Sequence, residues 1–189
     1  MLYTRKGDKG TTKLFDCPQG ERLSKNAAVF EALGTLDELN CSLGYAKALA
    51  LKSRDILGLS GRQTSYAVII ERLQNILFAI QAEIGGADKR PADADVTFSE
   101  QIVYEVETVL PPVNSFIIPG GSETSAYLDV ARTVARRAER AVITALQKDN
   151  RVVSDVTLQF LNRLSSVLYA LARFANYQEG LSERRPHYG

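Results

Sequence analysis

Four arginines lie between residues 131 and 140, at spacings that could place cations along one side of a helix. At about 100° per residue, Arg132, Arg136, Glu139 and Arg140 fall within a sector of about 100°. A guanidinium group is a planar fork of N–H donors that suits phosphate or carboxylate oxygens. Taken alone, the pattern is more typical of a solvated or interface face with charge pairs four residues apart. The rest of the chain must decide whether this row binds an anion.

A second cationic segment lies near the N-terminus, where Tyr3–Lys13 contains two glycines, three threonines and four cations. Glycine lets a backbone approach a ligand closely, and hydroxyls and cations are groups that contact phosphate oxygens. The spacing matches neither the Walker pattern GxxxxGK[ST] nor the dinucleotide pattern GxGxxG. Because such terminal arms are more often flexible tails, their chemistry alone is only a weak indication of a phosphate site.

The overall composition excludes several kinds of protein. A formal net charge of +1 gives no indication of nucleic acid or an anionic membrane as partner. His187 is the single histidine, which argues against histidine-based triads and multi-histidine metal sites. Cys17 and Cys41 lack CxxC spacing, so the expected compartment is the reducing cytoplasm. Neither a signal peptide nor an apolar run of about 18 residues is recognisable, so we expect no membrane segment.

Helical periodicity is the dominant pattern along the chain. It predicts helices at Ala27–Leu51, Gln63–Ile84, Ser122–Lys148 and Ser154–Gln178, and a short helix from Ser99 that ends before Pro111. The expected connections are polar loops at Lys52–Arg62 and Ala87–Thr97, and a β-like run with a Pro-Gly-Gly turn and serine cap at Phe116–Ser122. We predict an all-α, five-helix up-and-down bundle in one domain, 1–189. Within it, 1–26 is an irregular Gly-rich arm, 27–178 the bundle and 179–189 a polar tail.

Five separated segments together resemble the PduO-type ATP:cob(I)alamin adenosyltransferases. They are Tyr3–Thr12, Glu31–Asn40, Phe116–Gly121, Val130–Arg140 and Phe160–Ser165, in this order. No single segment is decisive, but the ordered set is specific and extends over residues 3–173. The resemblance implies a five-helix bundle that forms a homotrimer, with ATP bound between adjacent subunits.

The resemblance also implies roles for individual residues. Those that would bind ATP are Thr4, Arg5, Lys6, Gly7, Thr12, Lys13, Lys25, Arg136, Arg137, Glu139, Arg140 and Asn162. Mg²⁺ would be held mainly by the ATP phosphates, with protein ligands unknown. Asp37 and Arg132 would form a brace across the subunit boundary. Together with Arg136 and Phe116 they make up the expected catalytic set.

The implied chemistry explains why an internal histidine is not needed. In this family, the cobalt of cob(I)alamin attacks C5′ of ATP and triphosphate leaves, so the reaction requires pre-placed cations rather than a general base. Phe116 would displace the lower axial ligand of the corrin, and Phe116 and Tyr169 would contact cobalamin. The expected partners are a reductase that supplies cob(I)alamin and an adenosylcobalamin-dependent enzyme that receives the product.

Three departures from the family pattern concern the arm and the corrin side. Cys17-Pro18-Gln19 is an insertion between the arm and Lys25, Ser166 replaces a common aspartate, and Tyr169 replaces a common phenylalanine. One alternative is a non-catalytic sensor or carrier that binds ATP or corrinoid. Another is a structural bundle whose arginines form an interface, which leaves the Gly-rich arm and the Pro-Gly-Gly turn unexplained.

Overall fold

Three helices of the bundle begin at a serine whose hydroxyl accepts a backbone N–H of the first turn. Ser65 accepts from Val68, Ser122 from Ser125, and Ser154 from Thr157. Such caps satisfy N–H groups that have no partner inside the helix. The last two confirm the starts predicted for the arginine-rich helix and the final helix.

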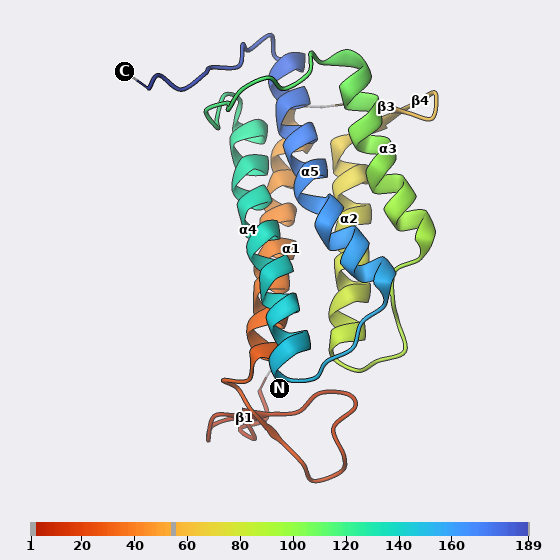
Figure 1. Ribbon diagram of the computed structural model, residues 1–189, viewed down its shortest axis with the longest axis vertical. Coiled ribbons are helices and arrows are strands. Elements are labelled where there is room, and N and C mark those ends of the chain that lie inside the picture. The colour runs from red at the N-terminus through yellow and green to blue at the C-terminus, as the bar shows by residue number, and fades with distance from the viewer. Residues whose placement is uncertain (1–2, 54–55, 189) are drawn as a thin grey trace.

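The computed structural model describes residues 3–53 and 56–188. Its helices are α1 (Ala28–Ser53), α2 (Tyr66–Ile84), α3 (Asp93–Val109), α4 (Glu123–Lys148) and α5 (Asp155–Gln178). Figure 1 shows α1, α2, α4 and α5 extending along the long axis, with α3 inclined beside α5. The predicted five-helix architecture is therefore confirmed. No helix in the described ranges is long and apolar enough to cross a membrane.

The core lies between the facing sides of the helices. It is filled by large apolar side chains from α1, α2 and α5, including Leu36, Leu43, Leu73, Leu77, Phe160 and Leu168. α4 contributes mainly small buried residues, Ala131, Ala135 and Ala138. Small side chains let α1 and α5 pack closely against α4. The arginines of α4 are consequently left on the outer side of the bundle.

The connection between α1 and α2 differs from the polar loop predicted at Lys52–Arg62. It contains an antiparallel hairpin of β3 (Ile56–Leu59) and β4 (Arg62–Ser65), and α2 starts at Tyr66 rather than Gln63. Leu57 and Leu59 alternate with exposed residues and are buried. This short period-2 pattern favours a strand over a loop. Residues 54 and 55 of the predicted loop lie outside the described ranges.

The third helix also starts earlier than predicted, at Asp93 instead of Ser99. The Asp95 carboxylate accepts the N–H of Ala92 at 3.1 Å and pairs with Arg72 at 3.1 Å. Asp93 and Asp95 therefore belong to the first turn of α3, where negative charge is favourable. A polar stretch that was expected to be a linker is the start of a helix of 17 residues.

The N-terminal arm lies at the end of the bundle where α1 begins and α4 ends (Figure 1). It contains two short antiparallel strands, β1 (Thr11–Thr12) and β2 (Leu23–Ser24). Phe15 N–H donates to the Gly85 carbonyl at 2.9 Å, and Asp16 pairs with Arg151 at 2.7 Å. These contacts attach the arm to the end of α2 and to the α4–α5 connection.

Candidate functional site

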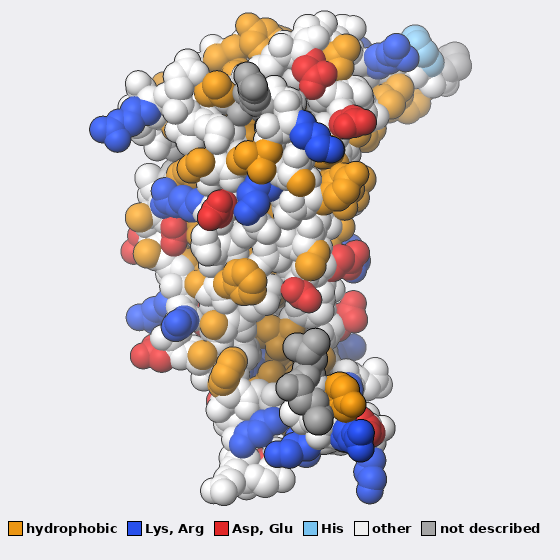
Figure 2. Space-filling model, turned by 180° about the vertical axis from the view of Figure 1, so that it is seen from behind, with side chains coloured by type: hydrophobic (Ala, Val, Ile, Leu, Met, Phe, Trp, Pro, Cys, Tyr) orange, Lys and Arg blue, Asp and Glu red, His pale blue; other side chains and the backbone are white. Residues whose placement is uncertain are grey.

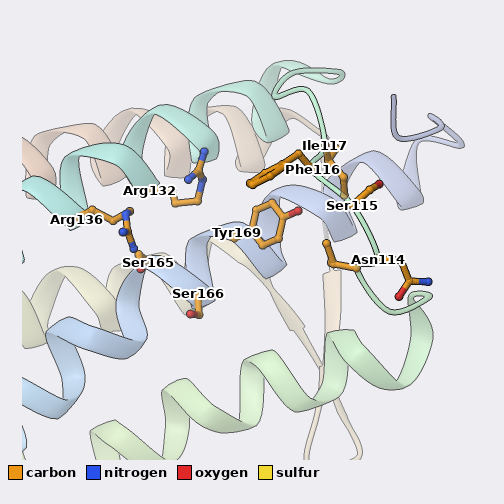
Figure 3. Close-up of a pocket in the computed structure, with 10 residues that line it drawn as sticks. Asn114, Ser115, Phe116, Ile117, Arg132, Arg136, Ser165, Ser166 and Tyr169 are labelled. Atoms are coloured by element: carbon orange, nitrogen blue, oxygen red, sulfur yellow. The ribbon is translucent and has the colours of Figure 1, made fainter. Parts of the chain in front are cut away.

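A pocket of about 560 Å³ opens between α4, α5 and the α3–α4 connection (Figure 3). Its lining brings together four of the predicted site residues, Phe116, Arg132, Arg136 and Tyr169. Ser166, which departs from the family pattern, also lines it. Asn114, Ser115, Ile117 and Ser165 complete most of the wall, and sequence reasoning did not identify them. The pocket combines an aromatic side with a cationic side.

Phe116 is 80% exposed, although its neighbours in the connection include apolar residues. Figure 3 shows its side chain extending from the connection toward Tyr169 and Arg132. A solvent-exposed aromatic ring that faces a pocket indicates that the pocket binds an apolar part of a ligand. The exposed position agrees with a role in ligand contact rather than in the core.

The Pro-Gly-Gly turn after Phe116 is fixed by Asn176 of α5. The Asn176 amide donates to the Gly120 carbonyl at 2.9 Å, and its oxygen accepts the Ser122 N–H at 2.9 Å. Gly121 has φ +124°, and a Cβ there would lie 2.2 Å from the Asn176 oxygen. Glycine is therefore required for both conformation and space. Sequence reasoning missed Asn176, although a polar residue among the apolar positions of α5 is the signal that could have identified it.

Tyr169 lies between two arginines on the pocket wall. The guanidinium carbons of Arg132 and Arg173 are 5.7 Å and 5.9 Å from its ring centre. Burial raises the pKa of Tyr169 above its ordinary value of 10.0; the Arg173 charge opposes this rise, Glu183 and Asp129 add to it, and Arg132 opposes it. The phenol is therefore neutral at neutral pH.

Within the chain, the ion-pair partner of Arg132 is Asp129, at 3.0 Å. Sequence reasoning missed this aspartate, which lies one turn earlier on α4 and is 9% exposed. Asp37, the predicted partner, lies in a different pocket, between α1, α2 and the arm. The predicted Asp37–Arg132 pair joins two subunits, so it stays a prediction.

The remaining residues of the arginine row have different partners. The Asn162 amide donates to Glu139 at 3.1 Å, which brings together two of the predicted ATP ligands from α5 and α4. Arg140 donates to the Arg136 backbone carbonyl at 3.0 Å. Arg137 instead faces α1 and pairs with Glu38 at 2.6 Å. In the part of the chain that the structure describes, Arg136 makes no ion pair, so its charge is available to a ligand.

The arm gathers many cations at its end of the molecule, as Figure 2 shows from behind. They are Arg5, Lys6, Lys9, Lys13, Arg22 and Lys25. Lys25 N–H donates to the Gly10 carbonyl at 2.9 Å, and a Cβ at Gly7 would lie 3.1 Å from Lys25 Nζ. Lys25 therefore lies against the glycines of the arm. Thr4 is exposed, and Thr12 pairs with Leu23 in the short sheet.

A second pocket, of about 910 Å³, contains Lys13 and Asp37. Two exposed aromatic residues, Phe15 (79%) and Phe78 (60%), lie at its wall. Exposed apolar surface rimmed by charges is typical of an interaction site. Predicted site residues therefore occupy two separate surfaces of one chain.

No group of three or more His, Cys, Asp or Glu residues that could hold a metal ion occurs within residues 3–53 and 56–188. Glu139 is the predicted site carboxylate that lies in the arginine row, and it faces Asn162.

Comparison with known proteins identifies the family. The cobalamin adenosyltransferase model matches residues 2–175. The chain is 37% identical over 179 residues to the corrinoid adenosyltransferase PduO of Citrobacter freundii, covering 91% of this chain and 49% of the relative. It is 36% identical over 186 residues to the corrinoid adenosyltransferase of Mycobacterium leprae, covering 93% of this chain and 91% of the relative. The chain thus spans about half the length of the Citrobacter protein.

A solved structure has the same fold. It is a variant of the PduO-type ATP:corrinoid adenosyltransferase from Lactobacillus reuteri, complexed with cobalamin and ATP. The match has a TM-score of 0.85 at 29% identity and covers 100% of this chain and 97% of the other. The family model and the Mycobacterium leprae relative each match almost all of this sequence. The chain belongs to the cobalamin adenosyltransferase family.

Proposed function

We propose that the chain transfers the 5′-deoxyadenosyl group of ATP to the cobalt of cob(I)alamin. The cobalt supplies the electron pair for the new Co–C bond, and the C5′–O bond breaks with its electrons going to triphosphate. The observation that carries this proposal is one pocket whose wall contains both the exposed Phe116 ring and Arg136, which forms no ion pair with a described residue. An apolar corrin face and a phosphate chain are the two surfaces that such a wall suits.

Charge on the leaving triphosphate is stabilised by cations that are already in position. Arg136 and Arg140 lack carboxylate partners in the described ranges. The helix rises by about 12 Å from Arg132 to Arg140. This length suits a triphosphate laid along α4. The arm would supply further donors from Thr4, Arg5, Lys6, Gly7, Thr12, Lys13 and Lys25.

The corrin would contact Phe116 and Tyr169. The Phe116 ring is an apolar wedge that would exclude the lower axial ligand and water from cobalt, which makes reduction of Co(II) to Co(I) easier. The Tyr169 ring offers a second aromatic surface. Its hydroxyl is neutral, so it adds no charge beneath the corrin.

The distribution of site residues supports a homotrimer with ATP between subunits. Asp37 and Lys13 line one pocket, whereas Arg132 and Arg136 line another. A brace between Asp37 and Arg132 would therefore join two chains. The number of subunits rests on the family resemblance.

The remaining expectations are part of the same proposal. Mg²⁺ would be bound mainly by triphosphate oxygens, with Glu139 beside it or the nucleotide. A reductase would supply cob(I)alamin, and an adenosylcobalamin-dependent enzyme would receive the product. The expected location is the cytoplasm.

The test combines the purified chain with ATP, Mg²⁺ and chemically reduced cobalamin. We expect the absorption spectrum to change to that of adenosylcobalamin, in amounts beyond one per site. ATP and cobalamin binding without a Co–C bond, even in a single turnover, would identify a sensor or carrier. Binding of neither substrate would leave the structural bundle as the explanation.

A further inference from the structure

The C-terminal segment 181–184 belongs to the polar tail predicted at 179–189, and it contacts the end of the bundle. The Leu181 N–H donates to the Asn176 carbonyl at 2.9 Å, which turns the chain back after α5. The Ile118 N–H donates to the Arg184 carbonyl at 2.8 Å. The segment and residues 117–121 line a shared cavity of about 360 Å³. Figure 1 shows both at the same end of the bundle.

A buried ion pair holds this segment in place. Arg173 of α5 is 8% exposed, and its guanidinium donates to both Glu183 oxygens, at 2.5 Å and 3.1 Å. It also donates to the Pro111 carbonyl at 3.0 Å. A buried guanidinium is strongly unfavourable without a partner, and a two-point carboxylate contact has a defined geometry. Arg173 thereby joins α5, the start of the α3–α4 connection and the C-terminal segment.

The connection that carries Phe116 is consequently held from both sides. Arg173 contacts it at Pro111, Asn176 contacts it at Gly120 and Ser122, and the C-terminal segment contacts it at Ile118. Phe116 lies between these contacts with its ring exposed. Since an exposed ring has few packing contacts of its own, its position depends on the backbone that carries it.

We infer that Glu183 is a positioning residue for Phe116. Its carboxylate binds Arg173, keeps segment 181–184 against the connection, and preserves the Ile118–Arg184 hydrogen bond next to Phe116. These Glu183 contacts fix the connection whatever reaction the protein catalyses. Its effect on the reaction rests on the proposed function, in which Phe116 faces the corrin.

The test uses Glu183→Ala, with Glu183→Gln as the conservative variant and Glu179→Ala as the matched control. Glu179 is an exposed carboxylate at the end of α5 whose side chain has no hydrogen bond or ion pair to any described residue. The first measurement is amide hydrogen exchange of residues 112–121 in the protein without substrates. We expect faster exchange at Ile118 in Glu183→Ala, a smaller change in Glu183→Gln, and none in Glu179→Ala.

The second measurement is adenosylation kinetics with each substrate varied in turn. Misplacement by about 1 Å of a group that positions the reactants can lower a rate up to a hundredfold. We therefore expect Glu183→Ala to lower kcat by about ten- to a hundredfold while KM for ATP stays within about twofold. Glu183→Gln should recover part of the rate because its amide oxygen can still accept from Arg173.

The two measurements separate the possible failures. Unchanged Ile118 exchange in Glu183→Ala would overturn the inference whether or not the protein is an adenosyltransferase. A KM for ATP that rises more than about twofold would also overturn it, because it indicates a general structural role rather than misplacement of Phe116. An inactive wild-type protein with the expected exchange change would contradict the proposed function and leave the positioning contact supported. If Glu183→Ala does not fold, Glu183→Gln is judged by the same criteria.

Discussion

At the scale of single residues, the arginines of α4 divide by their partners. Arg132 and Arg137 are paired with Asp129 and Glu38, whereas Arg136 and Arg140 have no carboxylate partner in the described chain. The sequence predicts the helix and the direction of its arginine face from periodicity. It does not predict these pairings, because Glu38 comes from another helix and Asp129 shares α4 with several other polar residues.

Arg136→Ala should lower kcat/KM by about a hundred- to a thousandfold, the usual effect of removing one donor to a developing negative charge. The side chain is exposed and unpaired, so the free energy of unfolding should change by less than about 0.5 kcal/mol. The measurement compares adenosylation kinetics and urea unfolding with those of Arg62→Ala, an exposed arginine on the hairpin. Equal activity in the two variants would show that the triphosphate lies elsewhere.

Tyr169 should make the stability of the protein depend on pH in the alkaline range. Burial raises the pKa of Tyr169 in the folded state, so folding favours the protonated phenol. This contribution is fully present below about pH 10, the unfolded value, and is lost as pH rises through the folded pKa. The free energy of unfolding of the wild type minus that of Tyr169→Phe should be constant between pH 7 and 9 and fall above about 10. Urea unfolding at each pH measures it, and a difference that rises with pH would contradict the assignment.

At the scale of elements, helices were predictable and the contacts between distant segments were not. Leucine and alanine spacing predicted α1, α2, α4 and α5 to within a few residues. The hairpin at 56–65 was missed because its period-2 pattern is only four residues long in β3. Periodicity does not specify how α5 packs against its neighbours. It therefore could not predict the hydrogen bonds of Asn176 with the Pro-Gly-Gly turn or the pairing of Arg173 with Glu183.

Arg151 connects the N-terminal arm to the helical bundle. Its guanidinium donates to Asp16 at 2.7 Å and to the Ile84 carbonyl at 2.6 Å, joining the arm, the end of α2 and the α4–α5 connection. Arg151→Ala leaves both acceptors without this donor, which should lower the free energy of unfolding by about 1–3 kcal/mol. Because the arm is then less fixed, ATP should also bind more weakly. Urea unfolding and ATP titration measure the two effects.

A double-mutant cycle with Asp16→Ala provides the control for this anchor. The two residues are in contact, so their effects on stability should be non-additive by about 0.5–3 kcal/mol. Additive losses would show that Arg151 acts through Ile84 alone and does not hold the arm.

At the scale of the whole molecule, the predicted site residues lie in two pockets on separate surfaces of the chain. The α1–α2 pocket contains Lys13 and Asp37, and the α4–α5 pocket contains Arg132, Arg136 and Phe116. The resemblance implied both sets of residues from sequence. The periodicity of one chain does not specify how two chains would meet, so the proposal that the two pockets form one site must be tested on the assembly.

Mixing two inactive variants tests a site shared between subunits. Lys6→Ala removes an arm cation and Arg136→Ala a helix cation, and each protein alone should be nearly inactive. In a closed ring of equally mixed chains, roughly a quarter of the sites would combine an intact arm with an intact α4. Co-expressed variants should therefore regain roughly a quarter of wild-type activity. Activity no greater than that of the separate variants would locate each site within one chain.

The exposed Phe116 ring also has a consequence for affinity. Covering a phenylalanine side chain that was in water contributes about 1.5–3 kcal/mol. A contribution of about 2 kcal/mol corresponds to roughly a thirtyfold smaller dissociation constant. The ring that shapes the pocket therefore also helps retain whatever molecule covers it. An enzyme with such a ring should release its product slowly unless a recipient or another ligand takes the product away.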